Sequence, residues 1–168
     1  AAAAAEYHGI PPREDLPPVG WATWYTYYEH IDEEIILANL EKAVELASRD
    51  GLEAMTLFQI DDGWQIRWGD WVANDGFPSG MAGLASTIKE AGMVPGIWIA
   101  PFYVSRESEV YADHPDWWVL GPDGEPITYS NLGTGDYAIV DATHPDAGSW
   151  MQEQVARLRS EGWEYLKL

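Results

Sequence analysis

The stretch Ala54-Met55-Thr56-Leu57-Phe58-Gln59-Ile60-Asp61-Asp62-Gly63 contains the features that decide the fold. A short, mostly apolar run ends at Ile60, and two acidic residues and a glycine follow it directly. Such a run is typical of a buried strand. The pattern therefore predicts a strand whose carboxyl end presents a pair of carboxylates, Asp61 and Asp62, to whatever lies at the edge of a sheet.

The same pattern repeats along the chain, because short apolar runs alternate with amphipathic stretches on both sides of this segment. The expected strands cover residues 19–25, 54–60, 93–100, 137–141 and 163–168. Three helices are expected. The first follows Asp32 as its N-cap and ends at Gly51, and the second surrounds residues 81–88 and ends at Gly92. The third runs from Pro145 to about residue 161.

This alternation predicts an α/β fold with a parallel sheet. We expect a (β/α)8 barrel of the TIM type, present only as its first half, with about four βα units and the start of a fifth strand. An open doubly wound sheet is disfavoured because no glycine-rich phosphate turn follows the first strand. Residues 1–18, with two Pro-Pro pairs, are expected to link the domain to an upstream region, and residues 19–168 to form the half-barrel.

Composition narrows the possible functions. Twenty-eight acidic residues against nine basic ones give a formal charge of −19, which repels nucleic acid. No apolar run approaches the roughly 20 residues that cross a bilayer, so a membrane-spanning role is not expected. The chain has no cysteine and starts with Ala rather than Met. No signal peptide is visible, we expect the true start to be missing, and the compartment stays open, with the cytoplasm slightly favoured.

Candidate site residues are expected where strands end, because the working residues of a β/α barrel gather at the carboxyl ends of its strands. Strand one is expected to end near Trp24, strand three near Trp98, and strand five to present Lys167. The carboxylates of Asp61 and Asp62 suit neighbouring sugar hydroxyls as acceptors. A divalent cation, a helix cap and a loop brace remain alternative interpretations of this pair.

The chain resembles bacterial α-galactosidases of the melibiase type, glycoside hydrolase family 36, from Pro18 to Leu168. The motifs that carry the resemblance stand in order along the chain: Gly20-Trp21-Ala22-Thr23-Trp24-Tyr25, Gln59-Ile60-Asp61-Asp62-Gly63-Trp64-Gln65, Gly69-Asp70-Trp71, Phe77-Pro78-Ser79-Gly80-Met81, Gly96-Ile97-Trp98-Ile99-Ala100-Pro101-Phe102, His114-Pro115-Asp116-Trp117, Asp141-Ala142-Thr143-His144-Pro145 and Tyr165-Leu166-Lys167-Leu168.

The resemblance implies a retaining glycosidase that releases terminal α-linked galactose from oligosaccharides such as melibiose and raffinose, without metal or organic cofactor. It implies that Asp61 and Asp62 bind the hydroxyls at carbons 4 and 6, that Trp24 and Trp98 line the galactose site, and that Lys167 binds the sugar near the nucleophile. In the family the nucleophilic Asp follows the Lys-Leu pair directly, and the acid/base Asp lies further on. The chain itself is therefore expected to hold no catalytic residue and to be inactive alone.

Two other functions remain open on the sequence. One is a galactosyl transferase of the raffinose-synthase kind, and the other is a non-catalytic carbohydrate-binding module. Galactose-containing oligosaccharides are the expected partners in all three cases. Because an open half-barrel exposes sheet edges and apolar surface, self-association of the chain is a further hypothesis.

Overall fold

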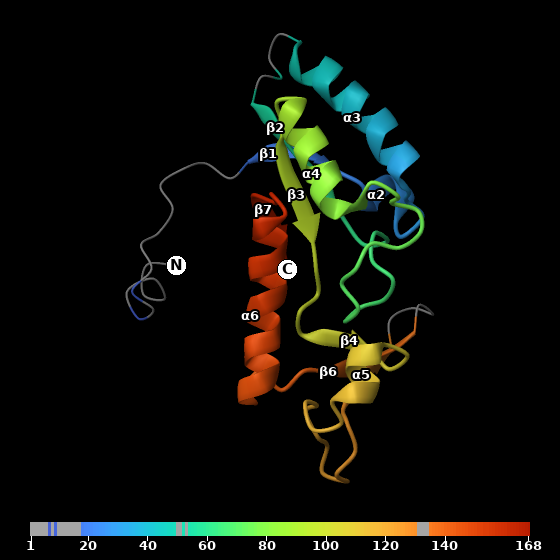
Figure 1. Ribbon diagram of the computed structural model, residues 1–168, viewed down its shortest axis with the longest axis vertical. Helices are drawn as coiled ribbons and strands as arrows, with labels where there is room; N and C mark the ends of the chain where they lie inside the picture. The colour runs from blue at the N-terminus through green and yellow to red at the C-terminus, as the bar shows by residue number, and fades with distance from the viewer. Residues whose placement is uncertain (1–6, 8, 10–17, 50–51, 53, 131–134) are drawn as a thin grey trace.

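The computed structural model describes residues 7, 9, 18–49, 52, 54–130 and 135–168. Figure 1 shows two parts along the long axis, a parallel sheet with α3, α4 and α6, and a smaller sheet with α5. The strands are β1 (Val19–Ala22), β2 (Met55–Ile60), β3 (Val94–Trp98), β4 (Tyr103–Ser105), β5 (Thr128–Ser130), β6 (Asp136–Ile139) and β7 (Tyr165–Lys167). The helices are α2 (Trp24–Tyr27), α3 (Glu33–Ala47), α4 (Gly80–Glu90), α5 (Glu109–Asp113) and α6 (Pro145–Ser160).

The larger sheet has the strand order β1-β2-β3-β7, and each neighbouring pair is parallel. The chain passes from strand to strand through α3, α4 and α6, as Figure 1 shows. Residues 57–60 of β2 are all buried, as expected of a central strand covered on both faces. The expected α/β class and the partial barrel are therefore confirmed.

Helix α3 forms where its sequence predicts it. The Asp32 side chain accepts a hydrogen bond from the Ile35 N–H at 2.8 Å and caps the first turn. Ile36, Leu40 and Ala43 recur at helical spacing and are the buried residues of the helix. The expected helix is confirmed, but its expected cap at residue 51 lies outside the described residues.

Helices α4 and α6 also match expectation. Met81, Leu84, Ala85 and Ile88 all face the core, and the glycine that ends this stretch, Gly92, has a φ of +84°. Helix α6 begins with Pro145 in its first turn, where a missing N–H leaves no helical hydrogen bond unmade.

The fourth expected strand is where the prediction was wrong. Residues 136–139 form β6, which pairs antiparallel with β4 and β5 in the separate three-stranded sheet. Strand β7 consequently pairs directly with β3. Among the described residues the parallel sheet therefore has four strands, and β7 is its fourth strand rather than its fifth. An apolar run predicts a strand but not its partner, because pairing depends on contacts far away in the sequence.

The first strand is shorter than expected. It ends at Ala22, and the Thr23 N–H makes a last bond to the Gln59 carbonyl at 3.3 Å. The Thr23 carbonyl then accepts from Thr26 and Tyr27, and this starts the short helix α2. Trp24 therefore lies on a helical turn after the strand and not on the strand itself.

Two apolar clusters hold the structure together. The larger lies between the parallel sheet and its helices and includes Phe58, Ile60 and Trp64, each with no exposed surface. The smaller lies under β4 and β6 and includes Val104 and Trp118. Within the described ranges no helix is long and apolar enough to cross a bilayer.

Candidate sugar-binding site

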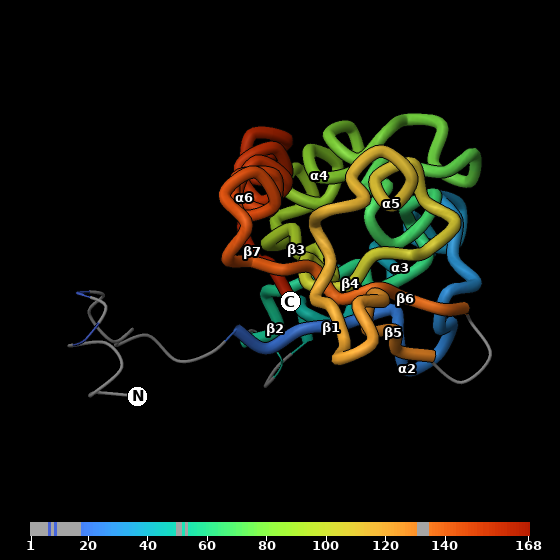
Figure 2. The backbone as a smooth tube through the Cα atoms, turned by 90° about the horizontal axis from the view of Figure 1, so that it is seen from below, coloured from blue at the N-terminus to red at the C-terminus, as the bar shows by residue number. Residues whose placement is uncertain are grey.

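Three of the predicted residues meet at the carboxyl ends of adjacent strands. Asp61 follows β2, while Trp98 ends β3 and Lys167 ends β7, where the two lie in register. The Lys167 Nζ lies 2.6 Å from Asp61 Oδ2 across the sheet edge. Figure 2 looks at the chain from this side and places β2, β3 and β7 close to one another. The parallel sheet thus joins residues that are 106 positions apart.

Asp61 is held in a fixed position at this edge. Its side chain is 4% exposed and accepts a hydrogen bond from Gln59 Nε2 at 2.7 Å as well as the bond from Lys167. Its backbone N–H donates to Thr23 Oγ1 at 2.9 Å, and Thr23 is fully buried. A buried carboxylate with a cationic partner and several donors is held in one orientation.

Asp62 has a different environment although it is the next residue. Its carboxylate accepts from Gln65 Nε2 at 2.5 Å and from Trp68 Nε1, which lies 3.1 Å from both oxygens. Burial raises the pKa of the Asp62 carboxyl above its ordinary value, and the bonds from Gln65, Trp68 and the Gly63 N–H oppose that rise. The negative charge of Asp61 adds to the upward shift of the Asp62 pKa.

The turn between the carboxylates and the next loop depends on Gly63. Its φ is +111°, and a Cβ at this position would lie 2.4 Å from the Glu29 carbonyl oxygen. The Gly63 carbonyl in turn accepts from Asn74 Nδ2 at 2.7 Å. Only glycine permits both this backbone conformation and this close approach, so the direction in which Asp62 points is set by the backbone.

The two predicted aromatic residues have different positions. Trp98 is half-buried, with its ring 5.2 Å from that of Trp68 and 5.8 Å from that of Trp71. Trp24, on α2, lines a cavity of about 440 Å³ together with Asp62, Gln65 and Trp68. Asp61, Trp98 and Lys167 are not among the residues that line this cavity. Asp62 and Trp68 therefore connect the Trp24 side of the site with the Asp61–Lys167 side.

Sequence reasoning missed the role of two of these neighbours, Gln65 and Trp68. Gln65 lies in the quoted motif but was assigned no role, and Trp68 is one of ten tryptophans. A possible signal was the spacing, because residues three and six positions after an acidic residue can fold back onto it in a tight loop. Such a signal is weak without knowledge of the loop conformation.

Asp141, which ends the run of residues 137–141, and His144, three positions further on, are not part of this site. Asp141 Oδ1 accepts from the Thr143 N–H at 2.9 Å and from its hydroxyl at 2.6 Å, so it braces a turn and its pKa is lowered by these bonds. His144 is the residue before α6, and its Nε2 lies 3.5 Å from Asp116. In the part of the chain that the structure describes, no group of three His, Asp or Glu residues could hold a metal ion.

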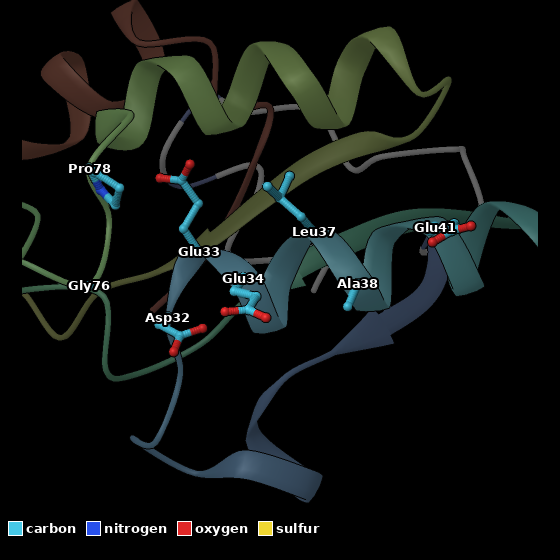
Figure 3. A pocket seen from close by; sticks show the side chains of 8 residues that line it. All are labelled: Asp32, Glu33, Glu34, Leu37, Ala38, Glu41, Gly76 and Pro78. Atoms are coloured by element: carbon cyan, nitrogen blue, oxygen red, sulfur yellow. The ribbon is translucent and has the colours of Figure 1, made fainter.

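A second hollow, of about 670 Å³, lies on the outer face of α3, as Figure 3 shows. Two of its acidic residues make structural contacts: Asp32 caps α3, and the Glu33 carboxylate accepts from the Ser79 N–H at 2.9 Å and from its hydroxyl at 2.6 Å. These bonds fasten the start of α3 to the start of α4. The hollow shares no lining residue with the cavity at Trp24 and Asp62, and it is not the candidate site.

The chemistry of the strand-end site suits a small polyhydroxylated ligand. Two ionisable carboxylates with spare lone pairs accept from hydroxyl groups, and the Lys167 ammonium can donate to a third oxygen. Aromatic rings at Trp24 and Trp98 offer flat apolar faces of the kind that pack on the C–H side of a sugar ring.

Comparisons with known proteins identify the family of the chain. The sequence model of the melibiase family matches residues 13–168. The chain is 35% identical over 137 residues to α-galactosidase AgaA of Geobacillus stearothermophilus, and this match covers 77% of the chain and 18% of AgaA. It is 32% identical over 159 residues to an α-galactosidase of Escherichia coli, covering 89% of the chain and 21% of that relative.

Solved structures give the same result. The chain superposes on TtGalA, the α-galactosidase of Thermus thermophilus in complex with stachyose, with a TM-score of 0.85 and 35% identity, covering 98% of the chain and 35% of TtGalA. It superposes on a variant of AgaA in complex with raffinose with a TM-score of 0.73 and 27% identity, over 89% of the chain and 20% of that structure. The chain thus spans about a third or less of the length of these relatives, and it belongs to the melibiase family.

Proposed function

We propose that a complete melibiase barrel carrying this chain is a retaining α-galactosidase, and that these residues form the part of its site that recognises galactose. The observation that carries the proposal is the meeting of Asp61, Trp98 and Lys167 at adjacent strand ends, next to Asp62. The likeness to TtGalA, whose complexes hold stachyose and p-nitrophenyl α-galactoside, supports the same substrate class.

Each residue then has a defined task. Asp61 and Asp62 accept hydrogen bonds from the hydroxyls at carbons 4 and 6, and Lys167 donates to a neighbouring sugar oxygen. The 4-hydroxyl is axial in galactose and equatorial in glucose, so a carboxylate fixed on one side discriminates between the two sugars. Trp98 packs on the ring, and Trp24 closes the side of the cavity beyond Asp62.

Bond cleavage in this proposal requires two further carboxyl groups about 5.5 Å apart, one to attack the anomeric carbon and one to protonate the leaving oxygen. Asp61 and Asp62 do not take these parts, because the proposal assigns both carboxylates to the hydroxyls at carbons 4 and 6. We propose that the nucleophile follows the Lys167-Leu168 pair. The 168-residue chain alone is then expected to leave p-nitrophenyl α-galactoside intact.

The experiment compares p-nitrophenyl α-galactoside with the corresponding α-glucoside, using a complete barrel that carries this chain. The galactoside should be hydrolysed and the glucoside should not. Losing a hydrogen bond to a charged group costs about 1.5–3 kcal/mol, so Asp62→Asn should lower kcat/KM roughly 10- to 100-fold. Asp75→Asn, at an exposed position in the same loop, is the matched control and should have no effect.

Two results would overturn the proposal. Equal rates on the two glycosides would remove the assigned selectivity, and an Asp62→Asn protein as active as the Asp75→Asn control would remove the assigned site. Product analysis with sugar acceptors separates hydrolysis from transfer, since a galactosyl transferase of the raffinose-synthase kind would yield a new oligosaccharide in place of free galactose.

We also propose that the isolated chain self-associates. Among the described residues, β1 and β7 are the edges of the parallel sheet, and each has one edge without a strand partner. Exposed edges of this kind pair with other chains. Light scattering on the isolated chain should therefore give a mass above 18.8 kDa, and a monodisperse monomer would contradict the idea.

A further inference from the structure

Trp68 lies in a loop whose conformation is fixed from several sides. Gln65 and Ala73 form a β-bridge across its base, and the Trp68 carbonyl accepts from the Ser105 N–H at 2.8 Å. Gly69 follows with a φ of +103°, and a Cβ there would lie 2.8 Å from Val104 Cγ1. The loop therefore packs tightly against β4, and the tryptophan has little freedom to move.

The indole of Trp68 contacts both kinds of proposed sugar-binding group, a carboxylate and an aromatic ring. Its Nε1 lies 3.1 Å from each oxygen of Asp62. Its ring lies 5.2 Å from the Trp98 ring at an interplanar angle of 63°, and 4.2 Å from the Tyr137 ring at 31°. Trp68 thus connects the carboxylate on the β2 side with the aromatic platform on β3, and β6 supports it from behind.

The donors around Asp62 leave it able to bind a ligand. An ionised carboxylate has about four lone-pair sites, and Gln65 and Trp68 occupy those that face the loop. Asp62 lines the cavity, so its remaining acceptor capacity is available there. Without the two donors only the Gly63 N–H would oppose the effect of burial, and the pKa of Asp62 would rise further.

We infer that Trp68 is a positioning residue, which fixes the Asp62 carboxylate and the Trp98 ring as one preorganised unit and so sets the selectivity for galactose. The inference rests on the proposed function of this site. It assigns the selectivity to a side chain that acts through Asp62. Preorganised hydrogen bonds of this type are made before the ligand arrives, so no binding energy is used to orient the carboxylate.

The test is Trp68→Phe in a complete barrel that carries this chain, because phenylalanine keeps a ring against Trp98 and Tyr137 but removes the N–H. We expect kcat/KM for p-nitrophenyl α-galactoside to fall roughly 10- to 100-fold. The acid limb of the pH profile should move to higher pH, because Asp62 then protonates more readily. Trp118→Phe is the matched control, since the same ring is kept and Trp118 Nε1 is buried without a hydrogen-bond partner among the described residues.

A double-mutant cycle separates positioning from a general loss of structure. In an Asp62→Asn background, Trp68→Phe should lower kcat/KM less than 3-fold, because the carboxylate on which it acts is gone. An equal loss in both backgrounds would overturn the inference. So would an unchanged acid limb in Trp68→Phe, or a loss in Trp118→Phe as large as in Trp68→Phe.

A second readout keeps this inference distinct from the proposed function. The indole N–H resonance of Trp68, assigned by its absence in Trp68→Phe, should shift in Asp62→Asn and titrate with the Asp62 carboxyl. If the complete protein hydrolysed no α-galactoside, the proposed function would fail while this contact could still be observed. A Trp68 resonance that ignores both the substitution and the titration would overturn the positioning role itself.

Discussion

Gly63→Ala is the perturbation that tests most directly how the backbone directs Asp62. The residue has a φ of +111°, and an added Cβ would lie 2.4 Å from the Glu29 carbonyl oxygen and 2.8 Å from its carbonyl carbon. Both atoms belong to the backbone between α2 and α3, so no side chain can rotate away to relieve the overlap. The chain must move either the Gly63 turn or the Glu29 segment.

The magnitude follows from two contributions. Placing a residue with a Cβ in the left-handed region costs about 1–2 kcal/mol, and forcing an extra methyl into a packed region costs about 1–3 kcal/mol. The free energy of unfolding should therefore fall by roughly 3 kcal/mol. Gly92→Ala is the matched control, because its φ is +84° and nothing lies within 4 Å of the added Cβ. It should cost only the first contribution, about 1 kcal/mol.

Urea denaturation followed by tryptophan fluorescence gives the free energy of unfolding of both variants, and calorimetry gives their affinity for galactose. Gly63→Ala should lose more stability than Gly92→Ala and should also lose galactose affinity, because Asp62 is displaced with the turn. Equal destabilisation by the two substitutions would refute the steric reasoning. A destabilised Gly63→Ala that still bound galactose normally would refute the link between this turn and the site.

Three further predictions concern single side chains. Lys167→Met should lower the free energy of unfolding, measured by urea denaturation, by about 2 kcal/mol. The loss is smaller than for a fully buried ion pair because the Lys167 side chain is 39% exposed. Adding Asp61→Asn should restore most of the lost stability, because no unpaired carboxylate then remains. No recovery in the double variant would contradict the ion-pair account. Asp62→Asn should raise the melting temperature at neutral pH. The pKa of the Asp62 carboxyl is raised in the folded protein, so the charged carboxylate lowers the stability at pH values above that pKa. The stability gained by Asp62→Asn should vanish below pH 3.8, the ordinary pKa of the group, where the carboxyl is protonated in both states. A melting temperature that does not rise at pH 7 would argue against this. Asp32→Ala should lower the free energy of unfolding by about 1 kcal/mol, because it removes the side-chain cap that accepts from the Ile35 N–H. Thermal unfolding measures this, and an unchanged melting temperature would contradict the capping role.

The elements that could be predicted from sequence are those with local signals. Asp32 before an amphipathic run predicted α3, and Pro145 predicted the start of α6, because caps and first turns are determined by a few neighbouring residues. Asp61 and Lys167 were both expected at strand ends, and the parallel sheet brings them to 2.6 Å. Their pairing was not predicted, since no local pattern specifies which strands become neighbours.

The errors came from long-range effects. Residues 136–139 read as a barrel strand because their apolar pattern is the same in either sheet, and only the contacts with β4 and β5 decide between them. Trp24 was expected on a strand, but hydrogen bonds to the Thr23 carbonyl turn the chain into α2 first. Trp68 was overlooked because its importance lies in a loop fold that places an indole against a carboxylate.

The antiparallel sheet formed by β4, β5 and β6 lies in the connection between β3 and α6, outside the ladder of parallel strands. Yet it supplies Ser105 to the Trp68 backbone and Tyr137 to the Trp68 ring. The side chains proposed to bind the sugar follow the parallel strands, whereas part of the support for the Trp68 loop comes from residues 103–139. Exchanging residues 103–139 between relatives should therefore alter the position of Trp68, and through it Asp62, while leaving the order of the parallel strands unchanged.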